Sequence, residues 1–385
     1  MVKVVHVGDV HLGRPFGFLP RDKAEKVRAA QMAALRNVAA LAREEGAAAV
    51  LVAGDLFDSN EAPGRLVRDV QEIIRQSGVE FYILPGAGGE GLEGHDGLAR
   101  NSVYRRESWR TVENAHVFME ERVFYVERGR LAIYGRPSVP GEPVLPRVAR
   151  DPRALFHIAL CHASVQFKSE IEDYPLSYDE IAASGYDYVA LGHWHKRQEH
   201  SSRGVTAWYA GCPETLEWDR DPRGCALLVT LEEGRVLVEP RVTGEFTWIS
   251  TTVDVAGDPA GIAATVLSRV SDPARTLVRV KLSGVVPAEG AASLAADVER
   301  ALAGTFYCSV DASRLRPALE PGRFPPGSIA AEYAGLLLAR LAEITADDPS
   351  GDRRRRILTA ALDKGLQLLT GEMTPQDLDL EVILQ

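Results

Sequence analysis

Five short segments in the first half of the chain carry residue types that bind divalent metal ions. They are Asp9-Val10-His11, Gly54-Asp55, His95-Asp96, Cys161-His162 and Gly192-His193-Trp194-His195. Oxygen and imidazole ligands without a thiolate favour Mn, Fe or Zn over a structural sulfur site. Two imidazole-plus-carboxylate sets sharing one carboxylate describe a pair of ions about 3.5–4 Å apart, which suits the cleavage of phosphate esters. The pattern predicts a two-metal phosphoesterase.

Each of these segments lies at or just after the end of an apolar, β-branched run. The runs read VKVVHVGD, AAVLVAGD, VEFYILPG, FHIALCHA and YDYVALGHWH. Between the first strands, residues 22–45 place Val27, Ala34 and Val38 on one helical face, which predicts a helix packed on a sheet. In open α/β sheets the loops at the carboxyl ends of strands converge on ligands. The same arrangement is expected here.

The order D-x-H, G-D, H-D, strand-H and G-H-x-H resembles the calcineurin-like metallophosphoesterase superfamily. Within it, the pieces GDVHLG, GDLFDS and GHWHK resemble the bacterial SbcD nuclease family and its archaeal and eukaryotic relatives in double-strand-break repair. The motifs span roughly residues 1–230. The resemblance implies an α/β fold, namely a four-layer α/β/β/α sandwich with a small α/β capping domain and a C-terminal helical segment.

The resemblance also implies a role for each ligand. Asp9, His11 and His195 are expected to bind the first ion, and Asp55 to bridge both ions. The expected remaining ligands of the second ion are His162 and His193. The implied cofactor is a pair of Mn ions, with Fe, Mg and Zn as alternatives.

The third segment departs from the family, whose usual wording there is P-G-N-H-D. Here Pro85-Gly86 is followed by AGGEGLEG and then His95-Asp96, which we interpret as an insertion. His95 then aligns with the histidine that assists the phosphate, and Gly94 occupies the position of an asparagine ligand. One ligand of the second ion is therefore missing, and its candidate replacements are water, Glu90, Glu93 and Asn101.

Asp58, three residues after Asp55, is the second candidate catalytic residue beside His95. Some relatives carry histidine at this position, facing the scissile phosphate. Asp58 can instead orient a metal ligand through a hydrogen bond. Capping of the helix that follows Pro63 is the competing interpretation.

The net charge of −10 argues against a simple electrostatic DNA-binding protein. Basic residues nevertheless follow the metal motifs, and aromatic residues accompany them in NSVYRRESWR, a mixture suited to phosphate contact and base stacking. The alternative is that these are ordinary surface charges. The predicted nucleic-acid-binding residues are Arg14, Arg105, Arg106, Lys168 and Lys196.

The pattern predicts four parts along the chain. Residues 1–245 form the metallophosphoesterase domain, and residues 246–319 read as β-α-β-α-β. By resemblance this second part is the capping domain that leans over the nuclease site, although a small stabilising domain is the alternative. A linker rich in Pro and Gly at 320–327 precedes a helical segment at 328–385.

Two apolar stripes in this last segment predict short amphipathic helices, which bury little by themselves. The resemblance implies that residues 328–370 bind the coiled coil of an SbcC-type ATPase. Docking onto the chain's own surface is the alternative. No apolar stretch approaches the roughly 20 residues that span a bilayer, and the four cysteines form no CxxC pair.

The sequence therefore predicts an Mn-dependent DNA nuclease of double-strand-break repair that cleaves phosphodiesters. The alternatives are a phosphoesterase for small phosphodiesters or nucleotides, and a scaffold with a partly degenerate metal site. The resemblance suggests a homodimer through the nuclease domain. The expected location is the cytoplasm, with the nucleoid, and not a membrane.

Overall fold

The computed structural model describes residues 1–86, 101–139, 141–165, 174–255, 261–286, 291–317, 324–344 and 351–371. Its contacts divide the chain into two compact units, Met1–Trp248 and Ile249–Gln385. The sequence places the first boundary at 245/246, three residues away. The finer division into capping domain, linker and helical segment stays a prediction.

The larger sheet of the first unit contains parallel strands whose carboxyl ends share one edge. β1 to β4 run parallel to one another, and β13 runs antiparallel to both β1 and β14. The order within this unit is β14 (Arg235–Asp254), β13 (Arg223–Glu232), β1 (Val2–Val7), β2 (Ala49–Ala53), β3 (Phe81–Leu84) and β4 (Ala115–Val117).

The smaller sheet has four parallel strands between two antiparallel edges. Its order is β11 (Gln198–Glu199), β12 (Thr206–Tyr209), β10 (Tyr188–Gly192), β7 (Phe156–His162), β6 (Leu131–Gly135) and β5 (Arg122–Val126). A short parallel pair, β8 (Ser164–Val165) with β9 (Pro175–Leu176), lies after β7 in the chain.

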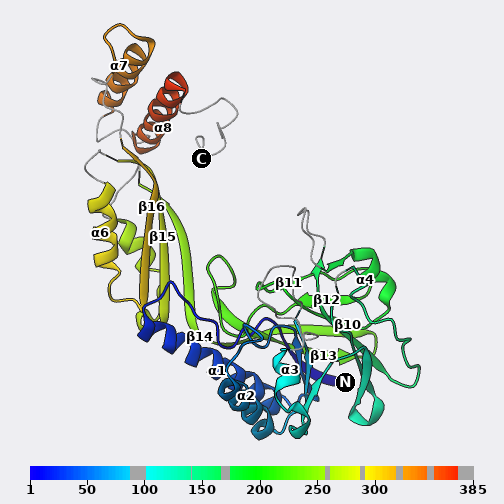
Figure 1. Cartoon of the computed structure of the whole chain (residues 1–385). Helices are drawn as coiled ribbons and strands as arrows, with labels where there is room; N and C mark the ends of the chain where they lie inside the picture. Colours follow the sequence, from blue (N-terminus) through cyan, green and yellow to red (C-terminus); the bar gives the residue numbers. More distant parts are fainter. Residues whose placement is uncertain are drawn as a thin grey trace. The chain divides into compact units, whose positions relative to one another are not determined.

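Helices cover the outer faces of both sheets. α1 (Arg21–Glu44) buries Val27, Ala34 and Val38 as its periodicity predicts, and α2 (Gly64–Ser77) lies beside it (Figure 1). The shorter elements are α3 (Val103–Arg106), α4 (Tyr178–Ser184), η1 (Trp109–Thr111) and η2 (Glu127–Gly129). α4 begins with a capping box in which the Ser177 hydroxyl accepts a hydrogen bond from the Glu180 amide at 3.1 Å.

Three apolar cores separate four layers. One lies between the larger sheet and α1 and α2, one lies between the two sheets, and one covers the outer face of the smaller sheet beneath α4. The residues Leu51, Tyr82, Ile158 and Leu227 illustrate the middle core, because each is at most 4% exposed. The α/β/β/α sandwich predicted from the sequence is thereby confirmed.

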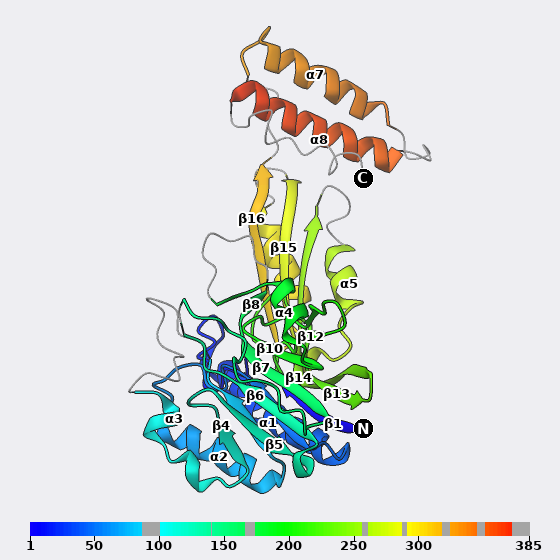
Figure 2. The same cartoon turned by 90° about the vertical axis from the view of Figure 1, so that its right-hand side faces the viewer.

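The second unit has the predicted β-α-β-α-β order. The end of β14 is followed by α5 (Gly261–Leu267), η3 (Pro273–Arg275), β15 (Thr276–Val286), α6 (Ala291–Ala301) and β16 (Tyr307–Pro317). β15 and β16 are parallel, and Val278, Val280 and Leu282 share a core with Ile262 and Val298 of the two helices. Figure 2 shows the three strands side by side.

Two further helices, α7 (Ile329–Ala342) and α8 (Gly351–Thr370), pack against each other. The Tyr333 hydroxyl donates a hydrogen bond to the carbonyl of Ala361 at 2.8 Å. Large apolar side chains remain outside this contact, since Ile329 is 75% and Leu336 66% exposed. In the described part of the chain no helix is both long and apolar enough to cross a membrane.

Candidate metal centre

The predicted ligands follow strand ends that the two sheets bring together. Asp9 and His11 come after β1, and Asp55 comes after β2. The backbone pairing continues past the strands, because the His11 amide donates to the Asp55 carbonyl at 2.8 Å. In the other sheet His162 ends β7 and pairs with Gly192 at the end of β10, just before His193.

Four of these residues have left-handed backbone conformations that are uncommon for residues with side chains. Their φ angles are +51° at Asp9, +47° at His11, +49° at Asp55 and +97° at His193. Such conformations cost of order 1–3 kcal/mol each and persist where the surrounding structure enforces them. Their concentration at one place marks a site whose geometry is maintained against local preference.

The side chains form two groups that each have metal-binding geometry. Asp9, His11 and His195 make one group, and Asp9, Asp55 and His162 make the other. Within each group the ligand atoms lie within 4.8 Å of one another. Asp9 belongs to both groups, whereas Asp55 Oδ2 lies 3.6 Å from Nε2 of both His11 and His162. The assignment of Asp55 as the bridging ligand stays a prediction.

Three imidazole rings are held through Nδ1, which leaves Nε2 to face the centre. The Nδ1–H group of His11 donates to Asp58 Oδ1 at 3.1 Å, and that of His195 donates to Glu217 Oε1 at 2.7 Å. His162 Nδ1 lies 2.9 Å from the carbonyl of Ala53. Metal-bound histidines are oriented in this way, by a carboxylate or carbonyl on the second ring nitrogen.

The second ring nitrogens of these histidines fit a cation. His11 Nε2 and His195 Nε2 lie 3.0 Å apart. His162 Nε2 is buried and has no hydrogen-bond partner among the described residues. A buried polar atom without a partner is costly, and a metal ion would satisfy it. The donor set of carboxylates and imidazoles therefore fits divalent metal ions, whose identity and number the arrangement leaves open.

The protonation of the site follows from burial and close charges. Burial raises the pKa of the Asp9 carboxyl, although the neighbouring His195 and His162 oppose the shift. Burial and the charge of His162 lower the pKa of His193 to about 4. Burial alone would lower the pKa of His195, but its hydrogen bond to Glu217 raises it above the usual value. The same hydrogen bond lowers the pKa of Glu217 to about 2.

The remaining predicted catalytic residues have different outcomes. Asp58 lies against His11, and it does not cap α2, whose N-cap is Pro63 without a side-chain hydrogen bond. His95 lies outside the described residues, and so do Asp96, Gly94, Glu90 and Glu93. Asn101 is exposed at the start of the next described segment, and its role as a replacement ligand stays a prediction.

The predicted nucleic-acid-binding residues lie on separate segments of the chain. Arg14 is partly buried in the loop after His11, and Lys196 is exposed directly after His195. Arg105 and Arg106 are exposed at the end of α3. Lys168 lies outside the described residues.

Sequence reasoning missed Glu217, which lies in the loop between β12 and β13. It accepts a hydrogen bond from Arg220 at 3.2 Å as well as from His195. The loop is held by Glu214, whose carboxylate accepts backbone hydrogen bonds from Thr215, Glu245 and Phe246. Burial raises the pKa of Glu214 to about 7. The only signal in the sequence was the acidic cluster in PETLEWDRD.

We expect Glu217→Gln to weaken binding of Mn²⁺ by about 10- to 100-fold, because partners of metal-bound histidines contribute this much to affinity. The amide keeps the size of the side chain and can still accept the hydrogen bond of the His195 Nδ1–H group, but it removes the negative charge that strengthens this bond. Titration calorimetry of the purified variant measures the change. Glu239→Gln is the control, since Glu239 is exposed on β14 and contacts Arg241. Unchanged affinity in Glu217→Gln would contradict the role assigned to this residue.

The parallel strand ends, the carboxylate common to both groups and the oriented imidazoles form a site that fits divalent metal ions. The model of the calcineurin-like phosphoesterase family matches residues 2–197, about half of the chain. The chain belongs to this family. Hydrolysis of phosphoester bonds with divalent metal ions is the chemistry that the family implies.

Two curated relatives and one solved structure are similar to parts of the chain. An uncharacterized metallophosphoesterase of Bacillus subtilis, YhaO, is 29% identical over 269 residues, which cover 65% of this chain. The chain spans only 62% of that relative's length. The DNA double-strand break repair protein Mre11 of Aeropyrum pernix is 41% identical over 76 residues, 20% of this chain and 17% of that protein. The crystal structure of TT1561 of Thermus thermophilus aligns with a TM-score of 0.39 and 16% identity, over 62% of this chain and 98% of that chain.

Proposed function

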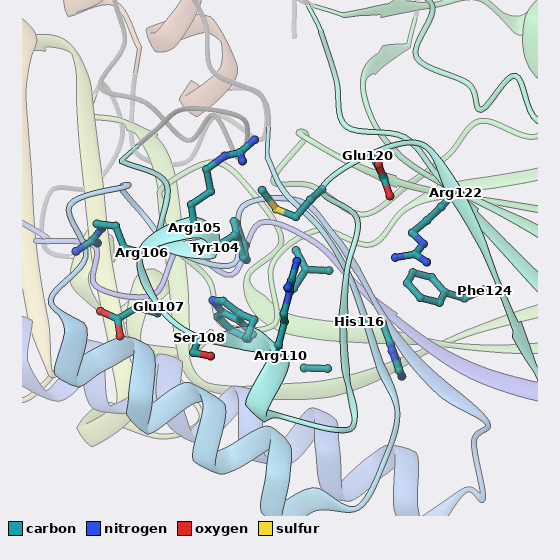
Figure 3. A pocket seen from close by; sticks show the side chains of 14 residues that line it. Tyr104, Arg105, Arg106, Glu107, Ser108, Arg110, His116, Glu120, Arg122 and Phe124 are labelled. Carbon is teal, nitrogen blue, oxygen red and sulfur yellow. The ribbon is translucent and has the colours of Figure 1, made fainter.

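We propose that this phosphoesterase is a DNA nuclease of the SbcD type. The observation that carries the proposal is an arginine-rich cleft of about 670 Å³ (Figure 3). The cleft lies where α3 and η1 meet the edge strands β4 and β5. Its basic and aromatic lining residues include Arg105, Arg106, Arg110, Arg122, Tyr104, His116 and Phe124.

The cleft is linked to the metal centre through Tyr104. This side chain also lines a small cavity together with Asp55 and Gly86. Burial and the nearby carboxylate of Asp55 raise the pKa of Tyr104, so the phenol stays protonated at neutral pH. Tyr104 therefore places an uncharged ring between the cleft and Asp55.

The arginines of the cleft differ in their exposure and in the groups that they contact. Arg105 and Arg110 are exposed, and the guanidinium of Arg122 stacks on the Phe124 ring at 4.7 Å. Arg106 donates hydrogen bonds to the carbonyls of Asn60 and Ala62, so it mainly fixes the loop after Asp55. Basic side chains interleaved with aromatic rings suit a single nucleic-acid strand, whose phosphates and bases they contact in turn.

In the proposed reaction the chain's residues hold and shape the centre. Divalent ions, when bound, supply Lewis acidity toward the phosphate and lower the pKa of the attacking water. The backbone amide of His193 donates to both carboxylate oxygens of Asp9, at 2.9 and 3.2 Å, and so fixes the shared carboxylate. His193 itself is neutral at physiological pH, because its pKa is about 4. Asp58 and Glu217 keep Nε2 of their histidines directed at the centre.

Hydrolysis of labelled single- and double-stranded DNA, beside bis-p-nitrophenyl phosphate, tests the proposal. We expect Mn²⁺ to support cleavage of both substrate types. The double variant Arg105→Gln/Arg110→Gln should lower the ratio of DNA to diester cleavage about tenfold or more at low salt, because two contacts with phosphates are lost. The same loss should reduce the salt dependence of DNA binding. Arg235→Gln, at an exposed position on β14, should leave the ratio unchanged.

Two results would contradict the nuclease proposal. Cleavage of the small diester without cleavage of DNA would favour a phosphoesterase for nucleotides or other small phosphodiesters. No hydrolysis of either substrate with Mn²⁺, Fe²⁺, Mg²⁺ or Zn²⁺ would favour a scaffold role.

We also propose that residues 328–370 bind an SbcC-type ATPase and that the nuclease acts as a homodimer in the cytoplasm, with the nucleoid. The exposed side chains of Ile329 and Leu336 on α7 support a partner there. Ile329→Asp/Leu336→Asp should prevent co-purification with the ATPase without lowering the melting temperature. A lowered melting temperature would instead favour docking onto the chain's own surface.

A further inference from the structure

A second cavity adjoins the other side chains that orient the metal ligands. It measures about 430 Å³ and is lined by the loop after His11 and by the loop that carries Glu217. Its floor includes Asp58 and Glu217, which hold His11 and His195. A group that fills this cavity therefore lies against the two carboxylates that orient His11 and His195.

The walls of this cavity are aromatic. Phe18 is 44% exposed, and its ring centroid lies 6.1 Å from that of Trp218, with 54° between the planes. Both rings also contact Trp248, at 5.8 Å from Phe18 and 4.8 Å from Trp218. Arg14 lines the same cavity.

The rings are supported from behind, so the cavity is formed before any ligand enters. Trp248 is 4% and Phe16 3% exposed, and their centroids lie 6.4 Å apart. The Trp248 amide donates to the carbonyl of Pro222 at 2.7 Å. Phe16 has a φ of +49°, and its carbonyl accepts a hydrogen bond from the Leu19 amide at 2.9 Å, in a tight turn that presents Phe18.

The charges of the lining residues determine which class of ligand the cavity can bind. Asp58 and Glu217 would repel a phosphate placed beside them, whereas a flat uncharged group can lie against the faces of Phe18 and Trp218. The cationic side chain of Arg14 can contact an anion. A ligand with a planar ring joined to a phosphate, which is the chemistry of a nucleotide, matches this distribution.

We propose that this aromatic pocket stacks an unpaired nucleobase next to the scissile phosphate, and that Arg14 contacts the adjoining backbone. The inference rests on the proposed nuclease function and names what its site recognises. Stacking requires a free base face, so a base released from the duplex enters the pocket and a paired base does not. The pocket therefore favours single strands and frayed ends.

Binding without hydrolysis provides the first test. Metal-free protein is titrated with the dinucleotide TpT and with its analogue lacking both bases, while tryptophan fluorescence is recorded. We expect TpT to quench fluorescence and to bind about 5- to 100-fold more tightly than the abasic analogue, the range typical of one stacked base. Trp218→Phe should remove most of the quenching, which assigns the signal to the pocket. Equal binding of the two ligands would overturn the inference.

Cleavage provides the second test. The p-nitrophenyl ester of thymidine 5′-phosphate and methyl p-nitrophenyl phosphate share a leaving group, and the first carries a thymidine where the second carries a methyl group. Phe18→Leu keeps apolar volume but lacks the ring, and it should lower the selectivity for the thymidine ester about tenfold. Phe18→Tyr should restore the selectivity. Tyr125→Leu, an exposed ring on β5 that contacts Asp151, should leave it unchanged.

The outcomes separate the two proposals. Cleavage of DNA with the same ester selectivity in Phe18→Leu as in the unaltered protein would overturn the aromatic pocket and leave the nuclease proposal intact. Base-dependent binding of TpT without cleavage of DNA would support the pocket and contradict the nuclease proposal.

Discussion

Asp55→Asn is expected to remove more than nine-tenths of the phosphodiester hydrolysis. Asp55 is only 8% exposed, and its Oδ2 atom lies 3.6 Å from Nε2 of His11 and of His162. Its charge therefore acts on both groups of ligands with little screening by water. The amide preserves the shape of the side chain but removes a negative charge that would offset the charge of the bound cations. A tenfold loss corresponds to about 1.4 kcal/mol in the activation barrier.

The measurement combines hydrolysis of bis-p-nitrophenyl phosphate with the metal content of the purified protein. Asp58→Asn is the matched comparison, because its amide oxygen still accepts the hydrogen bond from the His11 Nδ1–H group. We expect the second variant to lose much less activity than the first. Activity above a tenth of the unaltered level in Asp55→Asn, with the circular dichroism spectrum unchanged, would show that this carboxylate does not hold the ions.

The parts of the fold that bring the ligands together could be predicted because they depend on local patterns. β-Branched runs that end in D-x-H, G-D or G-H-x-H place polar residues at the carboxyl ends of strands. Parallel pairing then brings those ends to one edge, as it does for His11 beside Asp55 and for His162 beside Gly192. The helical spacing of apolar residues likewise predicts a helix over residues 22–45, and α1 spans Arg21–Glu44.

Contacts between loops distant in sequence could not be predicted. Glu217 reaches His195 from a loop that has no periodic pattern. The contact of His162 with Ala53 uses a backbone carbonyl, which no side-chain motif can indicate. The aromatic pocket needs Phe18 and Trp248, which are 230 positions apart in the numbering and meet only in the folded chain. The guanidinium of Arg106 donates to backbone carbonyls, which its motif does not indicate, and its contact with nucleic acid stays a prediction.

Gly54→Ala is expected to disable the centre without changing any ligand. A Cβ atom at Gly54 would lie 2.0 Å from Nδ1 of His162, closer than atoms can approach. His162 is fully buried and its Nδ1 contacts the Ala53 carbonyl, so the ring has no room to move away. The φ of +94° at Gly54 adds backbone strain to any larger residue. We expect at least a tenfold loss of hydrolysis and a lower metal content.

Gly78→Ala is the control that separates the effect of the steric clash at Gly54 from the effect of backbone strain. Gly78 ends α2 with a φ of +65°, and a Cβ atom there would meet nothing within 4 Å. Both alanines adopt a left-handed conformation, which costs about 1–2 kcal/mol. Thermal unfolding should therefore show a loss of stability in both variants, whereas metal content and hydrolysis should fall only in Gly54→Ala. Equal metal content and hydrolysis in the two variants would mean that His162 tolerates displacement, and its place among the ligands would then be wrong.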